Sequence, residues 1–357
     1  MDPNKRVKLG KTNVMIPQLG LGTNPLGGMF APISPEEAQA TVESCWDLGI
    51  RFYDTAPVYG YGNAERAVGA ILSKKPRSEF ILSTKVGRLL LADGPKDHED
   101  TMVLWDGKQL YKGTDSVKPY FDFSYDGVMR SIEASQKRTG IDRFDFMHIH
   151  DPDWFPEEAL EGAYKALDQL RSEGSIGAIG CGMNQWEVLA DFAKRADFDT
   201  FLLAGRYTLL DQSALEILLP ICIENHIVIV AGGVYNSGIL CNPDPSLALK
   251  TDRSSNAIGS WKDNVTYNYV PADQTIVEKT IKLKEICDRY NVPLMAAAIQ
   301  FPMYHPAIST VVMGPRSVEQ ARQNVEMFSI DIPQDLWNEM KYEKLLPKEA
   351  PTSTDIE

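Results

Sequence analysis

A short apolar segment followed by a segment of helical pattern recurs about eight times along this chain. The predicted strands lie at 19–23, 51–55, 80–86, 144–150, 177–181, 200–205, 226–232 and 310–314. The predicted helices lie at 35–48, 63–73, 126–139, 157–173, 185–194, 213–224 and 274–290, with 294–303 and 317–328 on either side of the last strand. Such alternation favours a parallel sheet, and eight units favour an α/β fold of the closed (β/α)8 type, the TIM barrel.

The alternative is an open, doubly wound sheet. That fold is typically marked by Gly-x-Gly-x-x-Gly after its first strand, and the nearest match, residues 20–25, ends in proline. A barrel core needs roughly 250 residues, so much of the remainder is expected in lid-like loops at 87–124 and 238–272, each following a strand end. We therefore expect one domain over residues 1–342 and a flexible tail over 343–357.

Charge and cysteine content exclude several classes of protein. A net charge of −13 makes nucleic acid and anionic membrane surfaces unsuitable partners. No apolar run has the length of a membrane span, and no signal peptide is recognised. The five cysteines form no Cys-x-x-Cys pair, which is typical of reduced thiols in a cytoplasmic protein. No metal site is predicted, and the oligomeric state stays open.

Titratable side chains stand at the ends of three successive predicted strands. Asp54 ends the second strand, Lys85 the third and His150 the fourth, while Tyr59 follows Asp54 by five residues. Strands buried on both faces are normally apolar throughout, so these residues are out of place in a pure core. In a parallel barrel the four side chains meet at the C-terminal rim, where barrel enzymes keep their active sites.

These four residue types suit hydride transfer between a nicotinamide and an alcohol or carbonyl carbon. A proton must then move on or off the oxygen, and Tyr59 serves if its pKa is lowered from about 10 towards working pH. The Lys85 ammonium is expected to lower it, with Asp54 holding that ammonium, while His150 donates a hydrogen bond to the substrate oxygen. Alone, each residue fits a structural role: a turn or helix cap, an ion pair, a core histidine, or a packed loop aromatic. All four together favour function.

With these residues in this order, the chain resembles the aldo-keto reductase superfamily. The resemblance runs through segments 19–23, 54–60, 83–85, 148–150 and 314–320. Segments 84–90, 148–152, 203–210 and 232–238 are similar to the branch that holds D-threo-aldose 1-dehydrogenases, L-fucose and L-galactose dehydrogenases and pyridoxal 4-dehydrogenase. The resemblance implies a TIM barrel, a nicotinamide cofactor and the four catalytic roles given above.

The same resemblance implies a set of cofactor-binding residues. They are Gly22, Thr23, Asn184, Gly233, Asn236, Ser237, Gly238, Leu240, Gly314, Arg316, Gln320 and Asn324. Asn184 is expected at the nicotinamide carboxamide, segment 236–240 at the pyrophosphate, and segment 314–324 at the adenosine.

The sequence departs from the family pattern at three of the positions expected near the nicotinamide. Met183 replaces a common serine, Ala204 a common glutamine, and Gly232-Gly233 an aromatic that stacks on the nicotinamide. At the adenosine end, Gln320 stands where many NADP-dependent relatives have arginine, so NAD is slightly favoured over NADP. Arg316 is either a 2′-phosphate contact or a helix-start charge.

The expected reaction is oxidation of the anomeric carbon of an aldose, of the L-fucose or D-threo-aldose type, to a lactone. The candidate substrate-binding residues are Trp105, Tyr125, Trp154 and Met183. Alternatives left open are a pyridoxal 4-dehydrogenase acting on the cyclic hemiacetal, a general aldehyde or ketone reductase, and a Schiff-base aldolase using Lys85. A further alternative is a cofactor-sensing regulatory subunit without enzymatic activity.

Overall fold

The structure is a computed structural model that describes residues 1–29, 31–101, 104–105, 108–111, 117–242, 244–245 and 266–352; at 104–105 and 108–109 only the backbone is described. Eight strands form a closed barrel in which all neighbouring pairs are parallel. Their bounds are β3 Leu19–Gly22, β4 Phe52–Asp54, β5 Ile81–Val86, β10 Phe146–His150, β11 Ala178–Met183, β12 Thr200–Ala204, β13 Val228–Gly232 and β16 Ile308–Met313. The predicted (β/α)8 barrel is confirmed.

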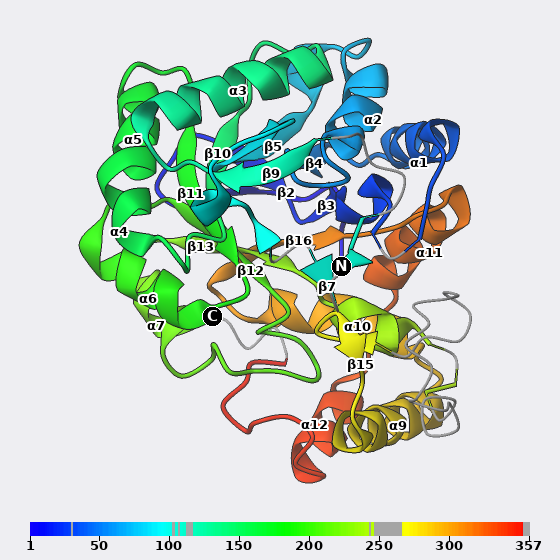
Figure 1. Ribbon diagram of the computed structural model, residues 1–357. Coiled ribbons are helices and arrows are strands. Elements are labelled where there is room, and N and C mark those ends of the chain that lie inside the picture. Colours follow the sequence, from blue (N-terminus) through cyan, green and yellow to red (C-terminus); the bar gives the residue numbers. More distant parts are fainter. Residues whose placement is uncertain are drawn as a thin grey trace.

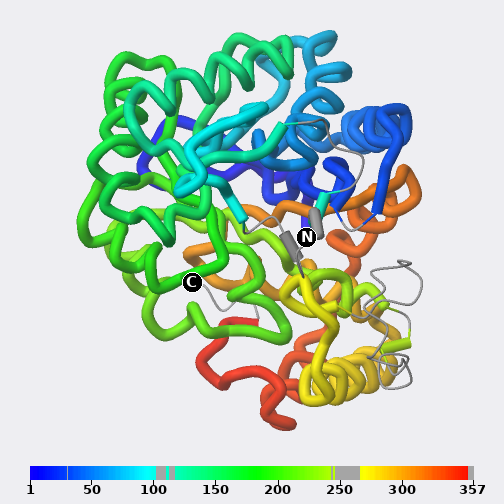
Figure 2. The backbone as a smooth tube through the Cα atoms, in the orientation of Figure 1, coloured from blue at the N-terminus to red at the C-terminus, as the bar shows by residue number. Residues whose placement is uncertain are grey.

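Helices surround these strands (Figure 1). They are α1 Pro35–Asp47, α2 Asn63–Leu72, α3 Tyr125–Thr139, α4 Pro156–Glu158, α5 Lys165–Ser172, α6 Trp186–Arg195, α7 Leu218–Glu224, α9 Gln274–Arg289, α10 Leu294–Gln300, α11 Val318–Ser329 and α12 Gln334–Tyr342. The first and last barrel helices, α1 and α11, pack side by side and so close the ring (Figure 2).

The predicted helices are found, with three differences. The segment predicted as one helix at 157–173 contains a π-helical stretch, Ala159–Tyr164, between α4 and α5. The helix predicted from residue 213 begins only at Leu218. Helix α12 was not predicted and packs on α9. At α1 the Ser34 side chain accepts from the Glu37 amide while Glu37 accepts from the Ser34 amide, so this start has a full capping box.

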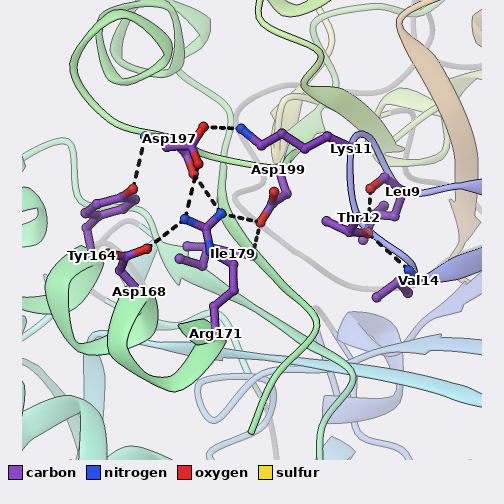
Figure 3. Close-up of polar contacts among 10 residues, drawn as sticks. All are labelled: Leu9, Lys11, Thr12, Val14, Tyr164, Asp168, Arg171, Ile179, Asp197 and Asp199. Atoms are coloured by element: carbon purple, nitrogen blue, oxygen red, sulfur yellow. Dashed lines mark hydrogen bonds and ion pairs between the residues drawn. The ribbon is translucent and has the colours of Figure 1, made fainter. Parts of the chain in front are cut away.

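A β-hairpin that the sequence did not predict packs against one end of the barrel interior. Its strands are β1 Arg6–Lys8 and β2 Met15–Pro17. Leu9 and Ile16 pack with Phe52 and Phe146 in one buried apolar cluster. The hairpin turn is held by Lys11, which pairs with Asp197, and Asp197 in turn accepts from Arg171 of α5 (Figure 3). The hairpin therefore covers the apolar lower layer of the barrel interior and shields it from solvent.

The opposite rim carries the insertions. Strand β6 Arg88–Leu91 pairs antiparallel with β9 Lys118–Phe121, so the insertion at 87–124 begins and ends as a β-ribbon after β5. From this insertion Tyr111 forms a bridge to Met29 and donates from its hydroxyl to Asn24 Oδ1 at 2.6 Å. The second insertion contributes a short hairpin, β14 Thr266–Tyr267 and β15 Val270–Pro271. Much of it, at 246–265, lies outside the described residues.

The tail differs from the expectation of a flexible segment over the part that is described. Leu345, Leu346 and Ala350 are buried, because these apolar side chains pack on the main hydrophobic core. The predicted boundary at residue 342 stays a prediction, and 353–357 lie outside the described residues. Within the described chain, no helix combines the length and apolar character that crossing a bilayer requires. The same residues contain no cluster of side chains suited to a metal ion.

Candidate active site

The upper layer of the barrel interior is polar, unlike the lower one. Inward-facing positions at the strand ends carry Asp54 on β4, Ser83 and Lys85 on β5, and His148 and His150 on β10. Gly180 on the neighbouring strand β11 makes room for His148, whereas Gly182 allows ordinary contact. A Cβ at Gly180 would lie 2.3 Å from His148 Cδ2, and one at Gly182 would lie 3.7 Å from Lys85 Cε.

Lys85 and Asp54 form a buried ion pair. Lys85 Nζ lies 2.6 Å from Asp54 Oδ2 and donates to the Thr55 carbonyl oxygen at 2.9 Å. Ser83 Oγ donates to the second carboxylate oxygen, Asp54 Oδ1, at 2.7 Å. The lysine side chain is 1% exposed. Removing either partner would leave an uncompensated buried charge, so the two residues behave as one unit.

Tyr59 stands above this ion pair on the turn after β4. The turn packs closely against the loop that follows β3. A glycine is needed at position 60, because its φ is 62° and a Cβ there would lie 2.2 Å from the Gly27 carbonyl oxygen. Lys85 Nζ lies 4.6 Å from the centre of the Tyr59 ring. The His150 ring stands edge-on to Tyr59, with 5.7 Å between ring centres. The structure thus brings the four predicted catalytic residues together at the C-terminal rim.

The pKa of Tyr59 shifts in the direction opposite to the one expected from the sequence. Burial raises the pKa of its hydroxyl well above 10, and the Asp54 carboxylate adds to this rise. The positive charge of Lys85 is largely balanced by Asp54 at 2.6 Å, so it does not outweigh desolvation of the phenolate. In the protein alone Tyr59 is a neutral phenol, ready to donate a proton rather than accept one.

His150 is neutral. Burial lowers its pKa well below 6.5, and the nearby charges of Arg88 and Lys85 act in the same direction. Its Nδ1 is buried with no hydrogen-bond partner among the described residues, whereas Nε2 lies 3.5 Å from Asp151 Oδ2. A neutral imidazole has one N–H donor, and a proton on Nε2 places that donor beside the Asp151 carboxylate.

Sequence reasoning did not single out His148. Its ring lies inside the barrel, with Nδ1 3.8 Å from Asp54 Oδ1, and burial lowers its pKa to about 3. Neither ring nitrogen has a hydrogen-bond partner within the described part of the chain. The signal was available: in a strand with alternating faces His148 must point the same way as His150.

Two further residues near the site were also not predicted. Asp151 follows β10 directly and is held by Arg88, whose Nη2 lies 3.1 Å from Asp151 Oδ2. Tyr269 lies in the turn of the β14–β15 hairpin at φ 67°, an unusual backbone conformation for an aromatic residue. Its ring packs against the apolar cluster that includes Met29 and Tyr111, which Tyr59 also contacts.

Asn184, the residue expected at the nicotinamide, lies near two other side-chain amides, those of Asn236 and Asn268. Around Gly205, at φ 71°, a Cβ would lie 3.7 Å from Asn236 Nδ2, 3.8 Å from Asn268 Oδ1 and 4.0 Å from Asn184 Nδ2. Asn184 also donates to the Ala204 carbonyl oxygen at 2.8 Å. Asn236 Oδ1 is buried and has no hydrogen-bond partner among the described residues. A group of side-chain amides with an unsatisfied acceptor fits the carboxamide of a nicotinamide.

The expected pyrophosphate turn has left-handed backbone at Asn236, Ser237 and Gly238, with φ of 46°, 61° and 105°. Gly233, just before it, is exposed at φ 61°. The amides of Asn236 and Gly238 already donate to carbonyl oxygens of Gly233 and Tyr235, and the Leu240 amide also donates to Tyr235. The predicted backbone contacts to a pyrophosphate would therefore have to share or replace these bonds, and they stay predictions.

At the expected adenosine end, Arg316 is engaged with the protein. Its guanidinium donates to the carbonyl oxygens of Met29 at 3.0 Å, Ala31 at 2.9 Å and Pro32 at 3.0 Å. This binding of backbone carbonyl oxygens is a third role for Arg316, beyond the two expected from the sequence. The Arg316 amide itself donates to Gln320 Oε1 at 2.8 Å. Asn324 Oδ1 accepts from the Tyr235 hydroxyl at 2.7 Å and so links α11 to the turn after β13.

The remaining expected cofactor residues sit at the top of β3 and β16. Gly22 pairs with Asp54 across the β3–β4 ladder, and Thr23 Oγ1 donates to the Asp54 carbonyl oxygen at 3.0 Å. A Cβ at Gly314 would lie 3.0 Å from Pro25. These three residues therefore border the catalytic strand ends, and their contacts to a cofactor remain predictions.

The expected substrate-binding residues lie on different elements, and their contacts with a substrate stay predictions. Met183 ends β11 and is buried. Trp154 packs at a tilt on Phe121, with 6.1 Å between ring centres, and is 53% exposed. Tyr125 is the first residue of α3 and is also exposed. The side chain of Trp105 lies outside the described residues.

A model of the Aldo/keto reductase family matches residues 18–342. The chain belongs to this family. As an aldo/keto reductase it is an oxidoreductase, and members of the family use NAD(P)H as cofactor.

Two relatives cover almost the whole of this aldo/keto reductase. It is 40% identical over 357 residues to pyridoxal 4-dehydrogenase of Microbacterium luteolum, which covers 95% of this chain and 97% of that protein. It is 38% identical over 333 residues to D-threo-aldose 1-dehydrogenase of a Pseudomonas species, covering 93% and 95%. Among solved structures, the glycerol dehydrogenase of Gluconobacter oxydans superposes with a TM-score of 0.71 at 19% identity, covering 100% and 99% of the two chains. That last likeness supports the barrel fold alone.

Proposed function

We propose that this aldo/keto reductase oxidises the anomeric carbon of an aldose to a lactone, with Tyr59 moving the proton. The observation that carries the proposal is the partly exposed Tyr59 phenol lying directly over the buried Lys85 ammonium, 4.6 Å from its ring centre. The neutral His150 ring stands edge-on to the Tyr59 ring. A proton-transfer group, a fixed charge and a hydrogen-bond donor then surround one reacting oxygen.

The steps balance as a two-electron oxidation. The C1 hydroxyl of a ring hemiacetal gives its proton to the Tyr59 oxygen, and the carbon–oxygen bond becomes the lactone carbonyl. When bound, the oxidised nicotinamide supplies the acceptor for the hydride that leaves C1. Lys85 stabilises the phenolate form of Tyr59 that the proton transfer requires, and Asp54 and Thr55 keep Lys85 in place. His150 Nε2 orients the reacting oxygen by a hydrogen bond.

The alternative is oxidation of pyridoxal, which presents the same chemical group as its cyclic hemiacetal. The two relatives, named for pyridoxal and for D-threo-aldoses, are almost equally similar to this chain. A general aldehyde or ketone reductase is a second alternative, favoured by the raised pKa of Tyr59, because reduction consumes the neutral phenol.

The aldolase and regulatory alternatives gain little support. A Schiff-base lysine must be neutral and reachable by a carbonyl carbon. Lys85 is 1% exposed, and its ammonium already donates to Asp54 and to the Thr55 carbonyl oxygen. A regulatory subunit without activity would have no need of the complete catalytic set.

For the cofactor we propose NAD slightly ahead of NADP. The Gln320 side-chain carbonyl already accepts a hydrogen bond from the Arg316 amide, and the Arg316 guanidinium donates to three backbone carbonyl oxygens. Neither side chain is presented as a ready 2′-phosphate site. We also propose a cytoplasmic protein, since all five cysteines are free thiols.

The test measures activity on a panel of substrates through the absorbance of the reduced nicotinamide. L-fucose, other threo-configured aldoses, pyridoxal and simple open-chain aldehydes are each scanned with NAD and NADP, and with the reduced cofactors for the reverse direction. We expect aldoses to give the highest kcat/KM in oxidation, with a lactone as first product. If pyridoxal is turned over far better than every aldose, pyridoxal replaces the aldose as the proposed substrate, and the catalytic roles stand. Turnover of open-chain aldehydes alone, only in reduction, would contradict the hemiacetal proposal.

A further inference from the structure

Asp151 places a carboxylate beside the catalytic histidine. The residue follows the end of β10, adopts φ 43°, and donates from its backbone amide to the Gly182 carbonyl oxygen at 3.0 Å. Its Oδ2 lies 3.5 Å from His150 Nε2. The Asp151 side chain is 25% exposed, so the carboxylate is only partly shielded from the space above the strand ends.

The carboxylate is held from behind by Arg88, the first residue of β6. Arg88 Nη2 lies 3.1 Å from Asp151 Oδ2, and Nη1 donates to the His150 carbonyl oxygen at 3.0 Å. The guanidinium also lies over the Phe121 ring, 4.7 Å from its centre. Arg88 is buried, and these contacts make it a positioning residue that fixes both Asp151 and the end of β10.

A purely structural role for Asp151 would be to neutralise Arg88. That role is already filled by Asp100, whose Oδ2 lies 2.5 Å from Arg88 Nε and whose side chain is fully buried. Arg88 therefore faces two carboxylates, and burial raises the pKa of Asp151 to about 6. Neutralising Arg88 does not require a carboxylate that is partly exposed and lies beside His150. Nor does it require the left-handed backbone conformation that Asp151 adopts.

We propose that Asp151 is a specificity-determining residue that accepts a hydrogen bond from the hydroxyl on the carbon next to the reacting carbon. The inference rests on the function proposed above and names the feature of the substrate that the site recognises. In the mechanism proposed above, His150 Nε2 donates to the reacting oxygen. A carboxylate oxygen 3.5 Å from that nitrogen is then within reach of the oxygen on the neighbouring carbon. An ionised carboxylate only accepts hydrogen bonds, so it selects a hydroxyl over hydrogen at that carbon.

The test compares L-fucose with 2-deoxy-L-fucose in the wild-type enzyme, Asp151→Asn and Asp153→Asn. A hydrogen bond to a charged group is strong, and leaving it unmade is unfavourable. We expect wild type to prefer L-fucose by about 10- to 100-fold in kcat/KM, mainly through KM. Asp151→Asn should lose most of that preference by slowing L-fucose oxidation while 2-deoxy-L-fucose oxidation stays within about threefold.

Asp153→Asn is the matched control, since it makes the same charge change two residues along the loop. Its carboxylate accepts from Gln185 Nε2 at 3.4 Å, so the preference should be retained. Equal turnover of the two sugars by wild type would overturn the inference and leave the proposed function standing, and this comparison needs no variant to fold. An equal loss for both sugars in Asp151→Asn would also overturn it, in favour of a structural role. If neither L-fucose nor any other aldose is oxidised, the proposed function fails and the inference fails with it.

Discussion

The ammonium nitrogen of Lys85 lies 4.6 Å from the centre of the Tyr59 ring, over its face. A cation in this position is attracted to the ring, and the attraction grows when the phenol loses its proton. Hydrogen bonds to Asp54 and to the Thr55 carbonyl oxygen keep Lys85 from turning towards solvent. In the proposed mechanism Tyr59 is therefore the group that meets the substrate, and Lys85 is a fixed charge behind it.

Tyr59→Phe should remove most turnover and leave nucleotide affinity almost unchanged. The ring and its packing survive, and only the proton-transferring hydroxyl is lost, a contribution of about 10²- to 10⁴-fold. Steady-state kinetics and nucleotide titration by fluorescence measure the two quantities. Tyr61→Phe, two residues along the same turn, is the control and should keep its activity. More than a tenth of wild-type turnover in Tyr59→Phe would contradict the role.

Lys85 should act through its charge and not through a covalent bond. Borohydride added with substrate, in the absence of nucleotide, should leave the protein mass unchanged, because the amine is buried and hydrogen-bonded to Asp54 and Thr55. A substrate-sized adduct on Lys85, detected by mass spectrometry, would instead support the aldolase alternative.

Lys85→Met should lower turnover as much as Tyr59→Phe does. It also leaves Asp54 as an unpaired buried charge, which destabilises a protein by about 3–5 kcal/mol. The double variant Asp54→Asn/Lys85→Met should regain much of that stability without regaining turnover. Recovery of both together would mean that Lys85 matters only for folding.

The pH dependence should differ between the two directions. Oxidation consumes the Tyr59 phenolate, and the pKa of Tyr59 is raised well above 10 by burial. The kcat/KM for oxidation should therefore rise by about tenfold per pH unit through the neutral and mildly alkaline range. Reduction consumes the phenol and should not rise with pH. Oxidation that is fastest in acid would contradict Tyr59 as the proton acceptor.

The sequence was sufficient to predict the barrel and the meeting of four side chains, because both follow from local patterns. Asp54, Lys85 and His150 interrupt apolar strands, and parallel strands bring their ends to one rim. His148 was missed although strand alternation places it on the same face as His150. The room for it comes from Gly180 on the next strand, a relation that only the strand register reveals.

The electrostatic expectations were less successful, since they depend on burial. Proximity of Lys85 to Tyr59 predicted a lowered pKa, but desolvation and the Asp54 carboxylate dominate in the folded protein. Asp151 lies directly after His150 in sequence, yet its proposed role depends on Arg88, 63 residues earlier, and on the Asp100 carboxylate that pairs with Arg88. The N-terminal hairpin and α12 were missed because short, separate elements have weak periodic signals.

Arg316→Ala should weaken NAD and NADP binding to a similar degree. The guanidinium donates to the carbonyl oxygens of Met29, Ala31 and Pro32, so its loss removes these hydrogen bonds and lowers stability by about 1–2 kcal/mol. Isothermal titration with both nucleotides and urea unfolding measure these effects. Arg322→Ala removes the same charge from an exposed position of α11 and should change neither. A selective loss of NADP binding in Arg316→Ala would restore the 2′-phosphate role.

Gly180→Ala should destabilise the barrel because of His148. The added Cβ would lie 2.3 Å from His148 Cδ2 and 2.9 Å from the Thr200 carbonyl oxygen, and overpacking of this kind destabilises a protein by about 1–3 kcal/mol. Gly182→Ala is the control on the same strand, since its nearest contact would be an ordinary 3.4 Å.

A double-mutant cycle isolates the contact between Gly180 and His148. In a His148→Ala background the ring is absent, so Gly180→Ala should cost at least about 0.5 kcal/mol less than it does in the wild type. Because His148 Nδ1 lies 3.8 Å from Asp54 Oδ1, Gly180→Ala should also lower turnover by shifting the carboxylate that holds Lys85. Urea unfolding and steady-state kinetics on all four proteins measure both effects. If the cost of Gly180→Ala is the same in both backgrounds, the glycine is required by the backbone of β11 and not by the histidine beside it.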